Sequence, residues 1–343
     1  MKNDSFLKAC RREAVGYTPV WLMRQAGRYM KEYMAIKEKY SFLEMCRNPE
    51  IACEVTMQPI KAFDMDAAII FADILLPLPG MGINLEFAKG DGPVIHNPVR
   101  TKKDIEAIRV INPEEDVPYL LKAIKLAKKE LNDRIPLIGF SGAPFTLASY
   151  LIEGGGSRNY VHTKSLMYNE PELWHKLMAK ITDVITVYLK AQVASGVQAV
   201  QVFDSWAGCL SPGDYKEFVL PYTKKAVQSV RGSVPVINFS TNTGTYLDAV
   251  RQAGGDVIGI DWKVRLDVAW KTIGYEFAIQ GNIDPAILFA PRVEIRKRVK
   301  EILDMAGGRP GHIFNLGHGI ILGTPVDNVR ALVDAVHELS GRK

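Results

Sequence analysis

The sequence of 343 residues predicts an α/β protein with a single closed (β/α)8 barrel. Eight apolar runs recur along the chain, and each is followed by a segment with helical spacing of its apolar residues. Within the runs the apolar residues are continuous, as expected for parallel strands buried on both faces. No linker interrupts the series, so we expect one domain over residues 1–343, with insertions accounting for its excess over the ~250 residues of a typical barrel.

The first predicted strand is Val20–Met23, which follows a short helix predicted over residues 3–15. A long polar segment leads from it to Asn48 and Pro49, a capping residue and a first-turn proline that predict the start of a helix. The second predicted strand is Asp66–Phe71.

An inserted hairpin is predicted after the second strand. Residues 77–100 are rich in Gly and Pro and contain two strand-like pieces, Ile83–Phe87 and Pro93–Ile95. A helix predicted over about 115–132 then returns the chain to the barrel.

The second half of the chain continues the alternation of predicted strands and helices. A long helix is predicted over Pro171–Ser195, where Gly196 ends it, and a last helix begins at Thr324-Pro325. The other six predicted strands are Pro136–Phe140, Ala199–Phe203, Val234–Phe239, Val257–Ile260, Phe277–Gln280 and His312–Leu316.

The main alternative is an open doubly wound sheet, which would usually carry a glycine fingerprint after its first strand.

Composition excludes several classes of function. The chain has 43 Lys and Arg against 38 Asp and Glu, a net charge of +5 that suits an acidic ligand, but no basic stripe indicates nucleic acid. The four cysteines form no Cys-x-x-Cys pair, so neither a disulfide framework nor a structural zinc site is expected. The most apolar stretch, Ala67–Leu78, is too short to span a membrane. From the polar, basic N-terminal residues we expect no signal peptide, and we expect a cytoplasmic protein.

Active sites of such barrels lie at the C-terminal ends of the strands, so polar residues that follow the predicted strands should share one mouth. Asp261 and Asp284 could equally cap the helices that follow them. The candidates are Arg24, Gln25, Arg28, Asp73, Ser141, Asp204, Ser205, Asn238, Ser240, Asp261, Asn282, Asp284, Asn315 and His318.

Four of these positions, considered with their sequence neighbours, indicate a binding or catalytic role most clearly. Arg24 and Arg28 flank a turn at Gly27 and could aim two donor forks at one carboxylate or phosphate, although two surface arginines are the alternative. Asp73 lies in an apolar stretch, where a carboxylate needs an arginine partner or a cationic or N–H-rich ligand. His318 lies between two glycines, which would allow the backbone to approach a ligand closely, and no neighbouring His or Cys favours metal.

The run Glu153-Gly154-Gly155-Gly156 lacks the Lys and Ser or Thr of a phosphate-binding P-loop. It is expected to form a mobile loop at the rim of the barrel.

Five motifs along the chain are specific in combination. They are Met23-Arg24-Gln25-Ala26-Gly27-Arg28, Phe71-Ala72-Asp73-Ile74-Leu75, Tyr150-Leu151-Ile152-Glu153-Gly154-Gly155-Gly156-Ser157, Phe203-Asp204-Ser205-Trp206-Ala207-Gly208 and Asn315-Leu316-Gly317-His318-Gly319. Taken together, these motifs resemble the uroporphyrinogen decarboxylase family, and the resemblance runs nearly end to end. It implies a single-domain (β/α)8 barrel that acts as a homodimer without cofactor or metal. Such enzymes remove CO2 from the four acetate side chains of uroporphyrinogen III and give coproporphyrinogen III, on the route to haem and other tetrapyrroles.

The resemblance also implies roles for single residues. Arg24 and Arg28 match arginines that hold substrate carboxylates, and Asp73 matches an aspartate that faces the pyrrole N–H groups. We expect Asp73 to stabilise a cation formed when the substituted pyrrole carbon is protonated. Three candidates could deliver the protons of this reaction: Arg24, a relayed water and Asp73. The other expected substrate-binding residues are Gln25, Ala26, Gly27, Tyr150, Phe203, Ser205 and His318.

Two alternatives are weighed against this function. Zinc-dependent corrinoid methyltransferases of the same barrel superfamily carry a His-x-Cys pair and a later Cys as ligands. Here the fifth predicted strand ends in Asn238-Phe239-Ser240, and Cys209 stands alone. A barrel that only binds tetrapyrroles would not need both Asp73 and the arginine pair.

Overall fold

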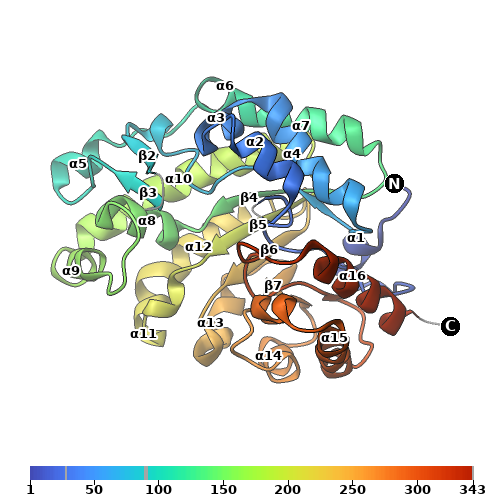
Figure 1. Ribbon diagram of the computed structural model, residues 1–343. Coiled ribbons are helices and arrows are strands. Elements are labelled where there is room, and N and C mark those ends of the chain that lie inside the picture. The colour runs from blue at the N-terminus through green and yellow to red at the C-terminus, as the bar shows by residue number, and fades with distance from the viewer. Residues whose placement is uncertain (28, 89–91, 342–343) are drawn as a thin grey trace.

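The computed structural model describes residues 1–27, 29–88 and 92–341 and is a (β/α)8, or TIM, barrel (Figure 1). Seven of its described strands form a curled parallel sheet, in which each strand pairs with the next strand of that sheet along the chain. Six of the eight predicted strands coincide with strands of this sheet to within a few residues, and a seventh, Asp66–Phe71, contains the two-residue strand β1. The strands are β1 (Ala68–Ile69), β4 (Leu137–Gly142), β5 (Ala199–Asp204), β6 (Val236–Ser240), β7 (Val257–Gly259), β8 (Ala278–Gln280) and β9 (His312–Ile313).

The predicted first strand closes the barrel, although only Val20 forms a ladder contact. Val20 bridges Phe314 in parallel on one side, and its carbonyl accepts the Asp66 N–H at 2.9 Å on the other. The Trp21 N–H still donates to the Phe314 carbonyl at 3.4 Å, but the next two N–H groups are bound by side chains instead of a neighbouring strand. Leu22 N–H donates to Gln25 Oε1 and Met23 N–H donates to Asn315 Oδ1, both at 3.0 Å. The strand ends early for this reason.

Eight of the described helices form the outer layer, one after each strand position. Figure 1 shows how they surround the sheet. The predicted helix over Pro171–Ser195 has those bounds, and Gly196 ends it with φ +113°. Asn48 caps α4 through the N–H groups of Glu50 and Ile51, as the sequence predicts. The outer helices are α4 (Pro49–Ala62), α7 (Pro118–Leu131), α10 (Pro171–Ser195), α12 (Leu220–Gln228), α13 (Leu247–Gln252), α14 (Leu266–Ile273), α15 (Arg292–Ala306) and α16 (Val326–Ser340).

Shorter helices lie in the connections and before the barrel. None of the described helices is both long and apolar enough to cross a membrane. The predicted helix over residues 3–15 is shorter in the structure, where α1 spans Ser5–Cys10. The others are α2 (Lys31–Lys37), α3 (Phe42–Arg47), α5 (Lys102–Ala107), α6 (Pro113–Asp116), α8 (Pro144–Glu153), α9 (Val161–Asn169) and α11 (Pro212–Asp214), with a π-helix η3 (Tyr215–Val219) and 3-10 turns η1 (Pro79–Met81), η2 (Ala207–Cys209), η4 (Gly244–Tyr246) and η5 (Pro285–Phe289).

Two antiparallel strands, β2 (Leu85–Ala88) and β3 (Gly92–Ile95), lie in the predicted insertion at the end of the molecule away from both termini (Figure 1). Ile95 N–H donates to the Gly154 carbonyl at 2.8 Å. Glu153 Oε1 accepts two hydrogen bonds from Thr163, each at 2.8 Å. The glycine run after α8 is therefore held in place, contrary to the mobile loop expected from its composition.

Inside the barrel, a polar chain crosses the core below the strand ends. Trp21 Nε1 donates to Gln280 Oε1 at 3.0 Å, and Gln280 Nε2 donates to Gln201 Oε1 at 2.9 Å. Gln201 Nε2 donates to the Met23 sulfur at 3.5 Å. All four side chains are buried. Because buried polar groups need partners, this chain of bonds orients the residue directly before Arg24.

Candidate active site

A cavity of about 1020 Å³ opens at the C-terminal ends of the strands. Its walls come from the loops after the Val20 segment, β1 and β9, from β4, β5, β6, α2, α3 and α8, and from the antiparallel strands β2 and β3. Eight residues that the sequence predicts as substrate contacts line this one space. They are Arg24, Ala26, Gly27, Asp73, Tyr150, Phe203, Ser205 and His318.

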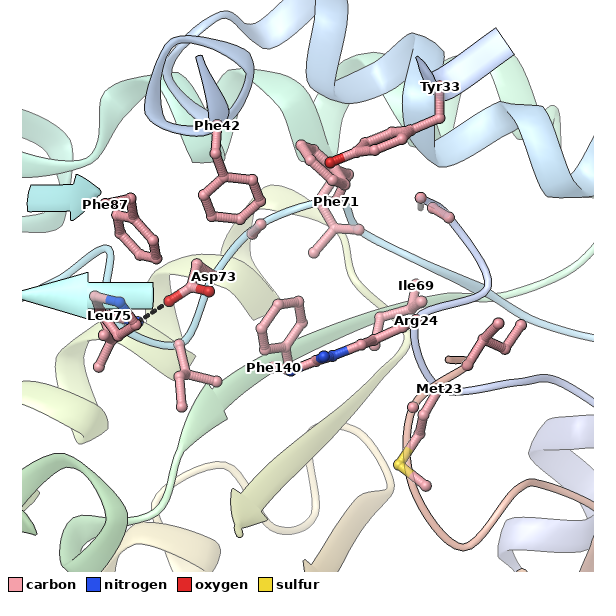
Figure 2. Close-up of a pocket in the computed structure, with 18 of the residues that line it drawn as sticks. Met23, Arg24, Tyr33, Phe42, Ile69, Phe71, Asp73, Leu75, Phe87 and Phe140 are labelled. Atoms are coloured by element: carbon pink, nitrogen blue, oxygen red, sulfur yellow. Dashed lines mark hydrogen bonds between the residues drawn. The ribbon is translucent and has the colours of Figure 1, made fainter. Parts of the chain in front are cut away.

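Arg24 reaches the cavity from a left-handed backbone conformation, with φ +60°. Such a conformation is uncommon for a residue with a side chain, and strained conformations of this kind are enriched at functional sites. Its side chain extends toward Phe140 in the close-up (Figure 2). The positive charge of Arg24 acts on both Tyr150 and His318, because it contributes a lowering effect to the pKa of each.

Gly319 provides the space for Arg24. A Cβ at Gly319 would lie 2.7 Å from Arg24 Cγ and 3.1 Å from Nε. Gly317 likewise packs against the backbone of Trp262. The glycines beside His318 therefore make room for protein neighbours, and the expectation that they serve close approach of a ligand is not needed to explain them.

The Gln25 side chain does not line the cavity. It is fully buried, accepts the Leu22 N–H through Oε1 and donates through Nε2 to the Ala67 carbonyl, both at 3.0 Å. Its main chain is engaged as well, because the Gln25 N–H donates to the Leu22 carbonyl at 2.9 Å and its carbonyl accepts the Tyr29 O–H at 2.8 Å. Gln25 therefore shapes the turn that carries Arg24. Arg28, the second arginine of the motif, lies outside the described residues.

Asp73 is half-buried on the loop after β1 and lies among aromatic rings (Figure 2). Its Oδ1 accepts the Leu75 N–H at 2.8 Å, so the loop orients the carboxylate. Burial raises the pKa of Tyr150 to about 12, the Asp73 carboxylate adds to the rise, and Arg24 opposes it. The carboxylate of Asp73, the guanidinium of Arg24 and the phenol of Tyr150 therefore interact electrostatically across the same cavity.

His318 enters the cavity from the loop after β9. Burial lowers its pKa, the charge of Arg24 lowers it further, and Asp261 partly opposes both. The imidazole is therefore neutral near pH 7 and offers one donor and one acceptor to a ligand.

A wall of phenylalanines was missed as a site feature. The Phe140 and Phe203 rings meet edge to face at 5.6 Å between centroids, and Phe203 meets Phe239 at 5.8 Å. Phe42 packs at 5.8 Å from Phe71. A signal for this wall exists in the sequence, because four predicted strands in succession end in Phe. Aromatic walls of this kind suit a large flat apolar ligand.

Basic side chains stand at the edge of the cavity. Lys37 and Lys39, at the end of α2 and just after it, are exposed and line the opening, together with Glu38. The sequence interpretation treated this part of the chain only as a polar segment. The edge is suited to an acidic ligand whose body lies against the phenylalanines.

Several polar residues at strand ends position loops instead of lining the cavity. Asn238 Nδ2 donates to the carbonyls of Val250 and Gly254, and Asn315 Oδ1 accepts the Met23 N–H. Asp284 accepts the Ala286 N–H at 2.9 Å and caps η5, which confirms the capping alternative. The residues that do not line the cavity are Gln25, Ser141, Asp204, Asn238, Ser240, Asp261, Asn282, Asp284 and Asn315.

No cluster of three or more His, Cys, Asp or Glu side chains suited to a metal ion occurs within residues 1–27, 29–88 and 92–341. Cys209, whose thiol pKa is raised by burial, stands apart from the cavity. The ligand set expected for a zinc methyltransferase is thus missing from the described residues.

Comparison with known proteins identifies the family. The family model for uroporphyrinogen decarboxylase (URO-D) matches residues 1–339. The chain is 63% identical over 339 residues to the uroporphyrinogen decarboxylase of Carboxydothermus hydrogenoformans, covering 98% of this chain and 97% of the relative. It is 57% identical over 338 residues to that of Sorangium cellulosum, with coverage of 98% and 97%.

A solved structure supports the fold. A methyltransferase from Methanosarcina mazei superposes with a TM-score of 0.84 and 21% sequence identity, covering 98% of each chain. That likeness concerns the fold alone, whereas the sequence matches concern the family. The chain belongs to the uroporphyrinogen decarboxylase family, whose members are carboxy-lyases of tetrapyrrole biosynthesis.

Proposed function

We propose that this chain decarboxylates uroporphyrinogen III to coproporphyrinogen III and four CO2, without a cofactor, in the biosynthesis of haem and other tetrapyrroles. The observation that carries the proposal is one cavity that combines a half-buried carboxylate, a wall of phenylalanines and a basic edge. Uroporphyrinogen has matching parts: a ring of pyrroles, converging N–H donors and eight peripheral carboxylates. Family membership supports the same substrate.

Asp73 is the group proposed to act on the reacting pyrrole. A proton adds to the ring carbon that bears an acetate arm, which leaves a cation delocalised onto the pyrrole nitrogen. The C–C bond to the carboxylate then breaks, CO2 leaves, and the bond electrons neutralise the cation. Protonation of the methylene carbon and loss of the ring proton complete the methyl group. Each cycle thus consumes one proton and releases one CO2.

The electrostatic role of Asp73 follows from its surroundings. When a substrate fills the cavity and displaces its water, a carboxylate among aromatic rings interacts with a nearby cation more strongly than one in water, because little solvent then screens it. Leu75 N–H fixes one of its oxygens before the substrate arrives. Removing one preorganised charge of this kind typically lowers kcat by about 10²–10³.

The cationic groups are proposed to hold the peripheral carboxylates. Arg24 lies on the cavity wall, and the planar donor fork of an arginine matches the geometry of a carboxylate on an acetate arm. The motif assigns the same role to Arg28. Lys37 and Lys39 suit the outer carboxylates as mobile charges. Neutral His318, Tyr150 and Ser205 are proposed to complete the polar contacts.

We also propose that the chain acts as a homodimer in the cytoplasm. Exposed apolar side chains beside the cavity support a second copy there: Trp262 is 37% exposed, Ile321 42% and Leu322 60%, and Leu322 lines the cavity. Light scattering on the purified chain should give twice the mass of one chain. A monomer at the same concentration would reject the dimer.

Anaerobic incubation with uroporphyrinogen III, followed by counting the carboxyl groups of the products, tests the function. The expected series runs from eight carboxyl groups to four and is unaffected by a metal chelator. Unchanged substrate would reject the proposal. Loss of activity in chelator, restored by zinc, would favour metal-dependent chemistry instead.

A further inference from the structure

Asp204 is a buried carboxyl group behind the cavity wall, and the proposed reaction does not use it. It is the last residue of β5, and its neighbours Phe203 and Ser205 both line the cavity. Asp204 itself is 1% exposed and turns toward α8, where Thr146 Oγ1 donates to its Oδ1 at 2.8 Å. Its other oxygen is buried and has no hydrogen-bond partner among the described residues.

The surroundings of Asp204 do not favour a negative charge. The titratable groups that face it are the thiol of Cys209 and the phenols of Tyr160, Tyr215 and Tyr246, all with pKa values raised chiefly by burial. Lys164 lies beyond Cys209, where its ammonium donates to the Cys209 carbonyl at 2.6 Å. Burial raises the pKa of Asp204 to about 7, although the Thr146 hydroxyl partly opposes this.

A short chain of contacts links Asp204 to the cavity. The oxygen of Thr146 that donates to Asp204 also accepts the Trp206 N–H at 3.4 Å. The Trp206 ring lies against Tyr150 with 3.9 Å between centroids. The Ser205 carbonyl is held separately by a neighbouring hydroxyl at 2.6 Å. Asp204 and Thr146 therefore fix the segment that carries Ser205 and supports Tyr150.

We propose that Asp204 is a positioning residue that acts as an uncharged carboxylic acid and, through Thr146, holds Ser205 and Tyr150 in place for the substrate. The proposal rests on the decarboxylase function above. When Asp204 loses its proton, an isolated charge is left in a dry layer, and the segment must shift to bring water or a donor to it. Substrate binding and turnover should therefore weaken as the pH rises through the ionisation of Asp204.

Asp204→Asn and Asp204→Ala test this proposal. The amide of Asn cannot ionise but can still accept from Thr146, so Asp204→Asn should keep activity at pH 6.5 and lose the alkaline decline of kcat/KM assigned to this group. Asp204→Ala should lower kcat/KM about 10- to 100-fold, because a shift of about 1 Å in a contact has effects of that size. Asp284→Asn is the matched control, an exposed acid after another strand, and should keep the wild-type pH profile.

Thr146 gives an independent readout. Thr146→Val should reproduce the loss seen in Asp204→Ala, mainly as a higher KM, and Thr146→Ser should restore activity. The proposal is overturned if Asp204→Asn and the wild type have the same pH profile between pH 6 and 9. Wild-type kinetics in Thr146→Val would also overturn it.

Unfolding measurements separate this proposal from the proposed function. Because the folded chain binds the Asp204 proton more tightly than the unfolded chain, the contribution of Asp204 to wild-type stability should fall as the pH rises from about 4 to 7. Asp204→Asn should remove that part of the slope, whatever the substrate. A chain that shows this difference yet leaves uroporphyrinogen unchanged would refute the function and not the positioning role. An unaltered slope in Asp204→Asn would refute the positioning role.

Discussion

Arg24 occupies the space that a side chain at Gly319 would fill. A Cβ at Gly319 would come within 2.7 Å of Arg24 Cγ, well inside normal contact distance. The two residues are almost 300 positions apart and meet because the segment after Val20 lies beside β9. Ile320 N–H donates to the Met23 carbonyl at 2.9 Å and fixes this approach. The direction of the arginine is therefore set by a glycine on another loop.

Gly319→Ala should displace Arg24 while leaving the barrel intact. We expect kcat/KM for uroporphyrinogen to fall about 10- to 100-fold, since misplacing a contact by about 1 Å has effects of this size. Steady-state kinetics with a thermal unfolding curve would check this. Gly156→Ala is the control, because no atom lies within 4 Å of its added Cβ. Equal activity of the two variants would contradict the proposed link.

Arg24→Lys keeps the charge and removes the planar donor fork. We expect kcat/KM to fall about 10- to 100-fold, the worth of one charge-assisted hydrogen bond. Arg12→Lys is a matched control, since Arg12 is exposed, lies away from the cavity and has the same φ of +60°. An unchanged kcat/KM in Arg24→Lys would show that a point charge suffices there.

A histidine on α16 should make stability depend on pH. His337 Nε2 lies 2.9 Å from the carboxylate of Asp66, and Tyr17 O–H donates to the same carboxyl group at 2.7 Å. Burial alone would lower the pKa of His337, but the hydrogen bond and charge of Asp66, with the charge of Asp64, raise it. The stabilisation is therefore full below about pH 6.5 and is lost as the pH rises through the higher folded pKa.

His337→Gln should accordingly lower Tm at pH 6 by more than at pH 9. Thermal unfolding of both proteins at several pH values measures the difference. A gap in Tm that stayed constant or widened toward pH 9 would contradict the pairing with Asp66.

The sequence predicts the barrel because its signals are local. Each buried strand is a continuous apolar run, and caps such as Asn48 and stops such as Gly196 mark helix ends within a few residues. The prediction is least accurate for the first strand, Val20–Met23. The N–H groups of Leu22 and Met23 donate to the side chains of Gln25 and Asn315 instead of to a neighbouring strand, and no local sequence pattern reveals which side chains will accept them.

The site was only partly predictable for a related reason. Position after a strand brings a residue to the correct end of the barrel, but it does not tell which way the side chain turns. Phe203 and Ser205 face the cavity, whereas Asp204 between them faces the helices because successive residues of a strand alternate. The fit of Gly319 to Arg24 depends on two loops meeting, and only the structure reveals it.

The central claim is that the carboxylate of Asp73 stabilises a cation on the substrate. The single-turnover rate of Asp73→Asn with uroporphyrinogen, measured beside substrate affinity and the unfolding curve, tests it most directly. We predict a fall in rate of about 10²–10³ with affinity and stability nearly unchanged, since the amide keeps the size but not the charge. A variant that decarboxylates at the wild-type rate would contradict the account.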